Sequence, residues 1–307
     1  MVKIFAYNKW GAGDYLSHLK GVLDAYEGKE AANSANQIDT IFVSRSLAAC
    51  ELAKYYGKNV LQLNLKNLIE ITWAFLMADV IIFSIGAKKE YYLGKTISMI
   101  SRKKILYLGD RCFAERYANI AYRSVARQEK LENLNSYRYA EEIGKRHQKV
   151  GILDSYDPRH KYKRLNDRSL LSIRNCIALM GYQPILINYV HRTGLKGISQ
   201  VQATNWSELR ECLRNIDFYV SGDSGWGHFA HEIGISGLSV FTAGDLVSCK
   251  PASQTSSSLG MYFSTSQPHC APCMIPGGKF GCREILCQGN LNKGAMLTAL
   301  LALKTEG

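Results

Sequence analysis

The chain has 307 residues, of which 47% are hydrophobic and 21% charged, with only 6 prolines. These values exclude a small disulfide-stapled module, a collagen-like chain and a disordered one, and the length suits two domains of roughly 150 residues each. Thirty-eight lysines and arginines against 26 acidic residues give a formal charge of +12, which predicts attraction to an anionic partner such as phosphate, nucleic acid or a lipid surface.

The apolar segments indicate a protein without a membrane span or export signal. The longest, Ile71 to Ala87, has Asp79 in its middle, where a charge would be costly in lipid. We expect it to form a buried helix end followed by a buried strand. Residues 1–7 are too short for a signal-peptide core. The predicted location is the cytoplasm, free or peripheral at the inner membrane.

In the first half, short β-rich runs alternate with segments of helical period, the pattern of parallel sheets covered by helices. We expect strands at residues 3–7, 40–43, 60–64, 80–84 and 105–108, and helices at 15–26, 45–56 and 65–77. Residues 110–147 are charged and mostly helical by period. One face of a helix in this region would carry Arg116, Arg123, Arg127 and Lys130. This face is either solvated or a contact surface for an anionic acceptor.

The alternation restarts near residue 148, which predicts domains at 1–148 and 149–307. We expect strands at 150–153, 184–188, 218–221 and 238–241, and helices at 167–180, 206–214, from 226, and at 292–303. Residues 244–289 indicate a long functional loop without regular structure, with a cysteine-rich part at 265–290. The predicted fold class is α/β, with two Rossmann-like doubly wound domains that face a ligand-binding cleft.

The first candidate site is the loop Gly11-Ala12-Gly13-Asp14, directly after the first strand. Glycines let the backbone approach a ligand, and the start of a helix favours negative charge. The loop is not the dinucleotide fingerprint, because Leu16 stands where a third glycine is needed. Asp14 is either the N-cap of the following helix or a carboxylate available as a general base.

The second candidate site is the string SGDSGWGH at residues 221–228, between an apolar strand and a helical run. Glycines, a carboxylate and hydroxyls at such a turn can form a backbone nest for phosphate oxygens, and His228 could add a donor. The alternative is a helix capped by Asp or Ser, with a histidine satisfied in the core.

The third candidate site consists of four closely spaced cysteines with three glycines among them: Cys270, Cys273, Cys282 and Cys287. Thiolates in such a cluster form tetrahedral zinc or iron sites. Two disulfides or unligated thiols are the alternatives, and a cytoplasmic setting disfavours disulfides. Four protein ligands leave no open position for catalysis, so the metal would be structural.

Together these motifs resemble glycosyltransferase family 9, the heptosyltransferases, including the branch that modifies autotransporter proteins. The resemblance rests on Asp223-Ser224-Gly225-x-x-His228, the Gly-x-Gly-Asp loop and Cys270-Ala271-Pro272-Cys273. It implies the GT-B architecture, with the first domain on the acceptor side and the second binding a nucleotide sugar. It also implies that the donor diphosphate and sugar are held by Asp223, Ser224, Gly225 and His228.

The resemblance also assigns roles outside that string. The proposed base of the family corresponds to Asp14, on an acceptor-side loop with Gly11 and Gly13. A family lysine before a Trp-Pro pair contacts the donor phosphate. This chain lacks Trp-Pro, and the nearest match is Lys163, with Lys161 and Arg164 as alternatives.

We therefore predict an inverting glycosyltransferase that moves a sugar, heptose favoured, from a nucleotide-diphosphate donor, ADP-heptose favoured, to a hydroxyl of a bacterial glycoconjugate or protein. A helix N-terminus and a cation would stabilise the leaving diphosphate without a catalytic metal. One alternative is a nucleic-acid-binding protein with a zinc loop, which the weakly basic cysteine loop disfavours. Another is a sugar-nucleotide epimerase or hydrolase of similar architecture. The oligomeric state stays open.

Overall fold

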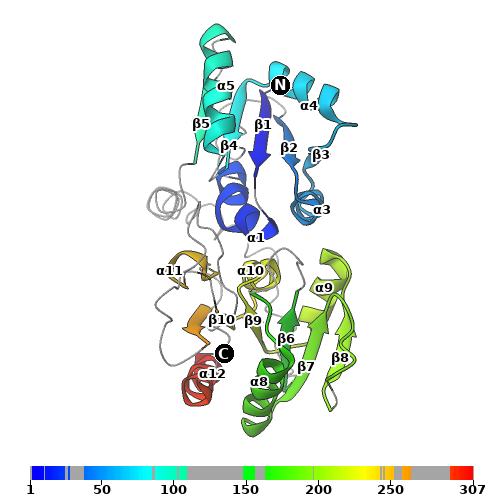
Figure 1. Cartoon of the computed structure of the whole chain (residues 1–307), viewed down its shortest axis with the longest axis vertical. Helices are drawn as coiled ribbons and strands as arrows, with labels where there is room; N and C mark the ends of the chain where they lie inside the picture. Colours follow the sequence, from blue (N-terminus) through cyan, green and yellow to red (C-terminus); the bar gives the residue numbers. More distant parts are fainter. Residues whose placement is uncertain are drawn as a thin grey trace, which may run out of the picture. The chain divides into compact units, whose positions relative to one another are not determined.

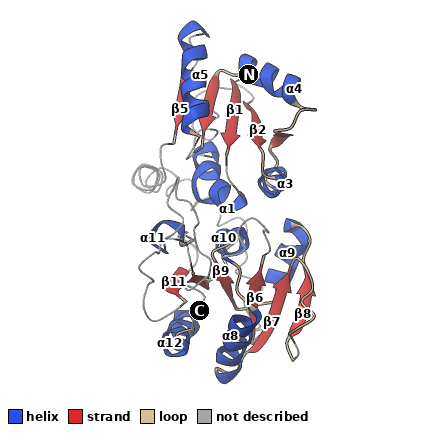
Figure 2. Cartoon of the chain, viewed as in Figure 1, coloured by secondary structure: helices blue, strands red, loops and turns tan. Residues whose placement is uncertain are grey.

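The chain folds as two compact α/β units, Met1–Glu142 and Ile143–Gly307. The computed structural model describes residues 2–9, 11–24, 27, 38–84, 87–101, 104–108, 148–155, 163–195, 197–242, 244, 246–251, 258–263 and 291–306. Each unit is a parallel sheet with helices packed against it (Figure 1, Figure 2). The predicted α/β class with two parallel sheets is confirmed. The cleft between two domains stays a prediction.

The first unit has a five-stranded parallel sheet in the order β3-β2-β1-β4-β5. The direction of winding reverses between the neighbours β1 and β4, so the sheet is doubly wound. Its strands are β1 (Val2–Asn8), β2 (Ile38–Ser44), β3 (Asn59–Gln62), β4 (Val80–Phe83) and β5 (Lys104–Tyr107), and its helical segments are α1 (Ala12–Asp14), the π-helical η1 (Tyr15–Leu19), α3 (Leu47–Tyr55), α4 (Leu68–Met77) and α5 (Lys88–Ser101).

The central strands of this sheet are apolar on both sides because helices cover both faces. All four residues of β4 are buried. On β2, Val43 belongs to a core cluster with residues of α4, whereas the ring of Phe42 contacts that of Tyr15 in η1, with centroids 5.0 Å apart. Successive side chains therefore point to opposite faces, as strand geometry requires.

The second unit has a six-stranded parallel sheet in the order β11-β10-β9-β6-β7-β8. Winding reverses between β6 and β9, the same topology as in the first unit. Its strands are β6 (Lys149–Asp154), β7 (Gln183–Asn188), β8 (Ser199–Gln202), β9 (Phe218–Gly222), β10 (Gly237–Phe241) and β11 (Ser258–Tyr262), and its helices are α8 (Asp167–Leu179), α9 (Trp206–Leu213), α10 (Gly225–Glu232), α11 (Leu246–Cys249) and α12 (Lys293–Glu306).

The core of the second unit joins the sheet to both α8 and α12. Ile173 and Ile177 of α8 share one buried cluster with Met296 and Leu300 of α12. The two helices lie side by side at the end of the unit (Figure 1). The predicted apolar closing helix is therefore confirmed, and it packs against the first helix of its own unit.

The prediction that residues 244–289 lack regular structure is wrong in the part that the structure describes. This part contains α11 and β11, and β11 pairs in parallel with β10 from Gly237↔Ser258 to Phe241↔Tyr262. Backbone hydrogen bonds to β10 hold β11 at the sheet edge, and a composition rich in Ser and Gly does not reveal that pairing. The polar edge strand β8 was not predicted for the same reason. Residues 264–290 lie outside the described part.

The prediction of a buried helix end within the apolar stretch is also wrong. β4 is buried as expected, but only Ile71 and Ala74 of α4 are buried. The outward stripe of α4 is exposed, with Trp73 at 65% and Leu76 at 48%. A helix that packs one face on a sheet leaves its other face outward whatever the residues are. None of the helices in the described residues has the length and apolar character that a membrane crossing requires.

Candidate functional site

The strongest candidate site lies at the carboxyl ends of β6 and β9, where the winding of the second sheet reverses. β6 ends in Asp154, and β9 is followed directly by Asp223. In chain order, β6 is followed by α8 and β9 by α10. Open α/β sheets bind their ligands at such a point, because the diverging loops leave space between them.

The turn after β9 is organised as the start of α10. Ser224 is the N-cap, and its Oγ accepts a hydrogen bond from the backbone N–H of Gly227 at 3.3 Å. The capping alternative for this serine is therefore present in the structure. Gly227 has a packing role, since a Cβ there would overlap the Ser221 side chain below it. The remaining N–H groups of the first turn give this end of the helix a partial positive charge.

Lys163 and Asp223 form an ion pair at this turn. Lys163 Nζ lies 2.6 Å from Asp223 Oδ2, and the two side chains are 18% and 5% exposed. Two glycines make the arrangement possible. A Cβ on Gly244 would overlap the Asp223 carboxylate, and a Cβ on Gly222 would lie 3.0 Å from the Lys163 carbonyl oxygen. The structure thus brings together Lys163 and Asp223, two residues that the sequence predicted for one ligand.

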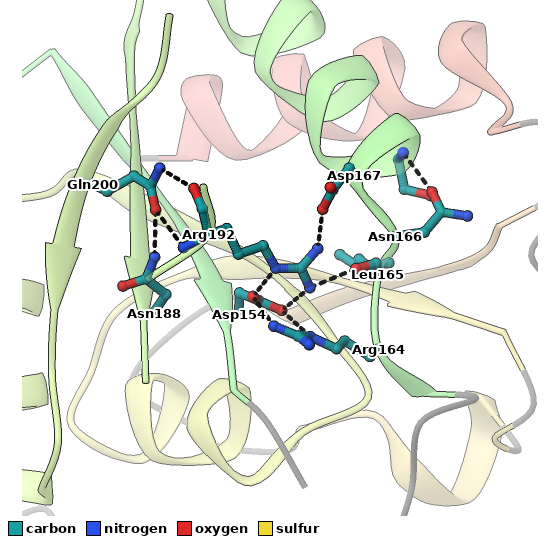
Figure 3. A network of polar contacts seen from close by, with 9 residues as sticks. Asp154, Arg164, Leu165, Asn166, Asp167, Asn188, Arg192 and Gln200 are labelled. Carbon is teal, nitrogen blue, oxygen red and sulfur yellow. Dashed lines mark hydrogen bonds and ion pairs between the residues drawn. The ribbon is translucent and has the colours of Figure 1, made fainter. Parts of the chain in front are cut away.

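Arg164 is predicted from the sequence as an alternative to Lys163 for the contact with the donor phosphate. In the structure Arg164 pairs with a different carboxylate from the one that Lys163 meets. Its Nη2 and Nε donate to the two carboxylate oxygens of Asp154 at 3.2 and 3.4 Å. Asp154 is almost fully buried and receives a second guanidinium, that of Arg192, with Nε···Oδ2 at 2.6 Å and Nη2···Oδ1 at 2.8 Å (Figure 3). A buried carboxylate held by two arginines is an anchored structural group. Lys161 lies outside the described residues.

Two histidines of α10 have different surroundings. His228 is half-buried, whereas His231 is buried. Burial, and next the neighbouring His228, lower the pKa of His231 to about 4. His231 is therefore neutral at pH 7, which suits a side chain that packs in the core. The core-histidine alternative concerns His228, which is only half-buried; the histidine that packs in the core is His231.

The loop after β1 lies at the corresponding switch point of the first sheet, between β1 and β4. The backbone N–H of Lys9 donates to Ser84 Oγ at 2.9 Å, which ties the ends of the two strands together. Gly11 is the N-cap of α1, and Asp14 is the last residue of that short helix. The N-cap alternative for Asp14 is therefore wrong. Gly13 lies inside the same helical turn.

The third candidate site lies outside the described residues, as does the basic stretch 110–147. The four cysteines of that site, which are therefore not described, are Cys270, Cys273, Cys282 and Cys287. Within the described part of the chain, no group of three or more His, Cys, Asp or Glu is placed to hold a metal ion. Four other cysteines lie in the described part of the chain and form no disulfide there: Cys50, Cys176, Cys212 and Cys249.

Sequence reasoning missed the two residues that organise this site, Asp154 and Arg192. Asp154 carries a signal that could have been used, because an acid that ends an apolar strand stands at the ligand-binding edge of a parallel sheet. Arg192 carries none. It lies 38 residues from Asp154 in the chain, in a polar loop after β7.

The two units together have the fold of known sugar-transferring proteins. The chain is similar to a family 9 glycosyltransferase from Veillonella parvula, with a TM-score of 0.63 and 11% identity over 100% of this chain and 98% of that one. It is similar to the E. coli heptosyltransferase WaaC with ADP, with a TM-score of 0.57 and 11% identity over 98% and 99% of the two chains.

A further similar structure is the dodecameric iron-containing heptosyltransferase TibC, from enterotoxigenic E. coli, in complex with ADP-D-beta-D-heptose. Its TM-score is 0.54 at 10% identity, over 99% of this chain and 78% of that one. No protein-family model matches the sequence, and no curated protein matches it significantly. At these identities the likeness is one of fold.

The neutral state of His231 predicts a pH-dependent stability. Its pKa is about 4 in the folded chain against 6.5 for the ordinary side chain, so the unfolded chain binds more protons between these values. The free energy of unfolding should therefore fall as the pH drops from about 6.5 to about 4, by roughly 3 kcal/mol from this group. Urea unfolding at several pH values measures the slope. His231→Gln should flatten it, because the glutamine side chain does not bind a proton in this range. An unchanged slope in His231→Gln would contradict the assignment.

Proposed function

We propose that the chain is an inverting glycosyltransferase that transfers a sugar from a nucleotide-diphosphate donor to an acceptor hydroxyl, with ADP-heptose as the favoured donor. The observation that carries the proposal is the Lys163–Asp223 pair at the start of α10. It puts a cation beside a helix N-terminus at a strand switch point, a combination that suits a diphosphate. The shared fold with heptosyltransferases supports the same conclusion.

In this proposal the second unit holds the donor. The N–H groups at Ser224 and Gly225, together with Lys163 and His228, would bind the diphosphate. Asp223 carries a negative charge, but its pairing with Lys163 offsets the repulsion that a bare carboxylate would exert on phosphate. A carboxylate oxygen of Asp223 would accept a hydrogen bond from a sugar hydroxyl.

The chemical step would be a single displacement. Asp14 would take the proton of the acceptor hydroxyl while the oxygen attacks the anomeric carbon and the bond to the diphosphate breaks. The diphosphate leaves with the bonding electrons, so its negative charge grows in the transition state. The α10 N-terminus and Lys163 would stabilise that charge where it develops. Attack opposite to the leaving group inverts the anomeric centre.

The first unit would present the acceptor, through the loop of Gly11, Gly13 and Asp14. The hydrogen bond from the Lys9 backbone N–H to Ser84 Oγ holds the start of that loop at the switch point of the first sheet. With a formal charge of +12, the chain would attract an anionic glycoconjugate or an acidic protein acceptor. A location at the inner face of the membrane belongs to the same proposal. The position of the Lys163–Asp223 pair at the strand switch point of the second sheet supports this function over nucleic-acid binding.

A structural metal on Cys270, Cys273, Cys282 and Cys287 is part of the proposal. Four thiolates are the ligand set of structural zinc and iron sites. TibC, of similar fold, is iron-containing. When bound, the metal would cross-link the cysteine loop and have no part in the transfer step.

Donor binding tests the assignment of the α10 turn. ADP-, UDP- and GDP-sugars should be compared by thermal shift, since a ligand that binds only the folded chain adds about 2.7 kcal/mol at 100 times its Kd. Ser224→Ala with His228→Ala should weaken the best donor at least ~10-fold, the scale of one charged hydrogen bond. Ser207→Ala, at an exposed position of α9, is the matched control. Equal donor affinity in the double variant and the wild type would remove the turn from the site.

Transfer itself tests the proposed base. Asp14→Asn should lower turnover by about 10²- to 10⁴-fold, because the amide cannot take a proton. Donor affinity should stay within a few-fold. Asp39→Asn on β2 is the control, since its amide can still accept from Asn59. Product analysis with and without acceptor separates transfer from epimerisation or hydrolysis. Unchanged turnover in Asp14→Asn would exclude this residue as the base.

Elemental analysis tests the cysteine site. The purified chain should hold about one zinc or iron ion, and Cys270→Ser with Cys273→Ser should lose it and lower the melting temperature. Cys212→Ser changes a free thiol elsewhere and should keep the metal. A wild-type chain that is fully folded without metal would refute the site.

A further inference from the structure

The position of Lys163 depends on a segment with little regular structure of its own. Residues 163–166 come directly before α8, whose N-cap is Asn166. A lysine side chain on such a segment can reach many positions, since its stem has four rotatable bonds. Something must therefore hold the backbone of this segment if Lys163 is to meet Asp223 in a defined way.

Arg192 supplies that hold. Its Nη2 donates to the backbone carbonyl of Leu165 at 2.8 Å and to Asp154 Oδ1 at 2.8 Å, and its Nη1 donates to Asp167 Oδ1 at 2.5 Å. One planar guanidinium thus joins the end of β6, the segment after Lys163 and the start of α8 (Figure 3). The two parallel bonds to Asp154 fix the plane of the group.

Arg192 is itself fixed by its backbone. The side-chain amide of Gln200, on β8, accepts from the Arg192 N–H at 3.1 Å and donates to the Arg192 carbonyl at 2.9 Å. Asn188, the last residue of β7, donates to the same Gln200 oxygen at 2.7 Å. The loop after β7 is therefore anchored to the sheet edge, and the guanidinium transmits that anchoring to the Lys163 segment (Figure 3).

The nitrogen atoms of Arg192 are all used within the protein. Nε, Nη1 and Nη2 each donate to a protein oxygen, and the side chain is only 10% exposed. Four of its five N–H donors are therefore already bound within the protein. Arg164 next to Lys163 is also directed away from Asp223, toward Asp154. Of the three charged side chains, Lys163 is the one turned to Asp223, and the other two hold the segment.

We infer that Arg192 is a positioning residue for the donor diphosphate, acting through Lys163; the inference rests on the proposed function. Arg192 fixes the carbonyl of Leu165, two residues beyond Lys163, while the absence of a side chain at Gly222 lets the Lys163 carbonyl approach from the other side. Arg192 therefore holds the segment, and Gly222 leaves room for it, before any ligand arrives. A lysine at position 192 would keep the positive charge. It would lose the planar guanidinium, which donates to Asp154, Asp167 and the Leu165 carbonyl at the same time.

A double-mutant cycle tests this coupling. The ligand is whichever of ADP, UDP and GDP raises the melting temperature of the wild type most, and its Kd is measured by calorimetry. Lys163→Ala should weaken binding by roughly 10- to 150-fold, and Arg192→Lys by roughly tenfold, the scale of charged hydrogen bonds. In the Lys163→Ala background, Arg192→Lys should weaken binding less than ~2-fold, because the residue that it positions is gone.

Two controls separate positioning from a general loss of structure. Arg174→Lys removes another guanidinium contact to a backbone carbonyl, that of Gly197, and should leave Kd unchanged. If Arg192→Lys is not folded at the assay temperature, Gln200→Met replaces it in the cycle, because it releases the Arg192 backbone and keeps the guanidinium.

The outcomes distinguish the two proposals. Independent, multiplicative effects of Lys163→Ala and Arg192→Lys on Kd, with binding to the wild type intact, would overturn the role of Arg192 and leave the proposed function standing. A wild-type chain that binds none of the three nucleoside diphosphates would overturn the proposed function, and the role of Arg192 with it.

Discussion

The buried carboxylate of Asp154 is the group on which the arrangement of the second unit's site depends. A charge with 2% of its side chain exposed requires partners, and here two guanidinium groups supply them. These partners come from two different loops, those after β6 and β7. Because both must reach the same carboxylate, the loops are held together at the carboxyl edge of the sheet. The Lys163–Asp223 pair lies next to this anchored segment.

Charge is distributed in the site in a way that suits an anion. The pair of Lys163 and Asp223 is neutral as a whole, and Asp154 is compensated by its arginines. The partial positive charge of the α10 N-terminus is therefore not cancelled by an uncompensated carboxylate beside it. Glycines at 222 and 244 keep this arrangement compact.

The two units use the same topology for different local chemistry. Both sheets reverse their winding between the first strand and the fourth strand in the chain order of the unit. In the first unit the switch point carries a short turn of helix that continues as the π-helical η1, tied by Lys9 to Ser84. π-Helical turns are often found at functional sites. In the second unit the switch point carries ion pairs and a serine-capped helix.

Local patterns in the amino-acid sequence predict the α/β class, most of the strands and helices, and the turn at residues 221–228. Those features are local, because a buried strand, a helical period and a glycine-rich turn are each encoded within about ten residues. The local patterns failed for β8 and β11, whose polar or glycine-containing residues become strands only by pairing with a neighbour, and for α4, whose apolar outer face the composition could not distinguish from a buried one. The contacts of Lys163 with Asp223, and of Arg192 with Asp154 and Leu165, become visible only in the folded chain. Partners that lie dozens of residues apart meet where the order of strands in the sheet brings their loops together, and no local pattern records that order.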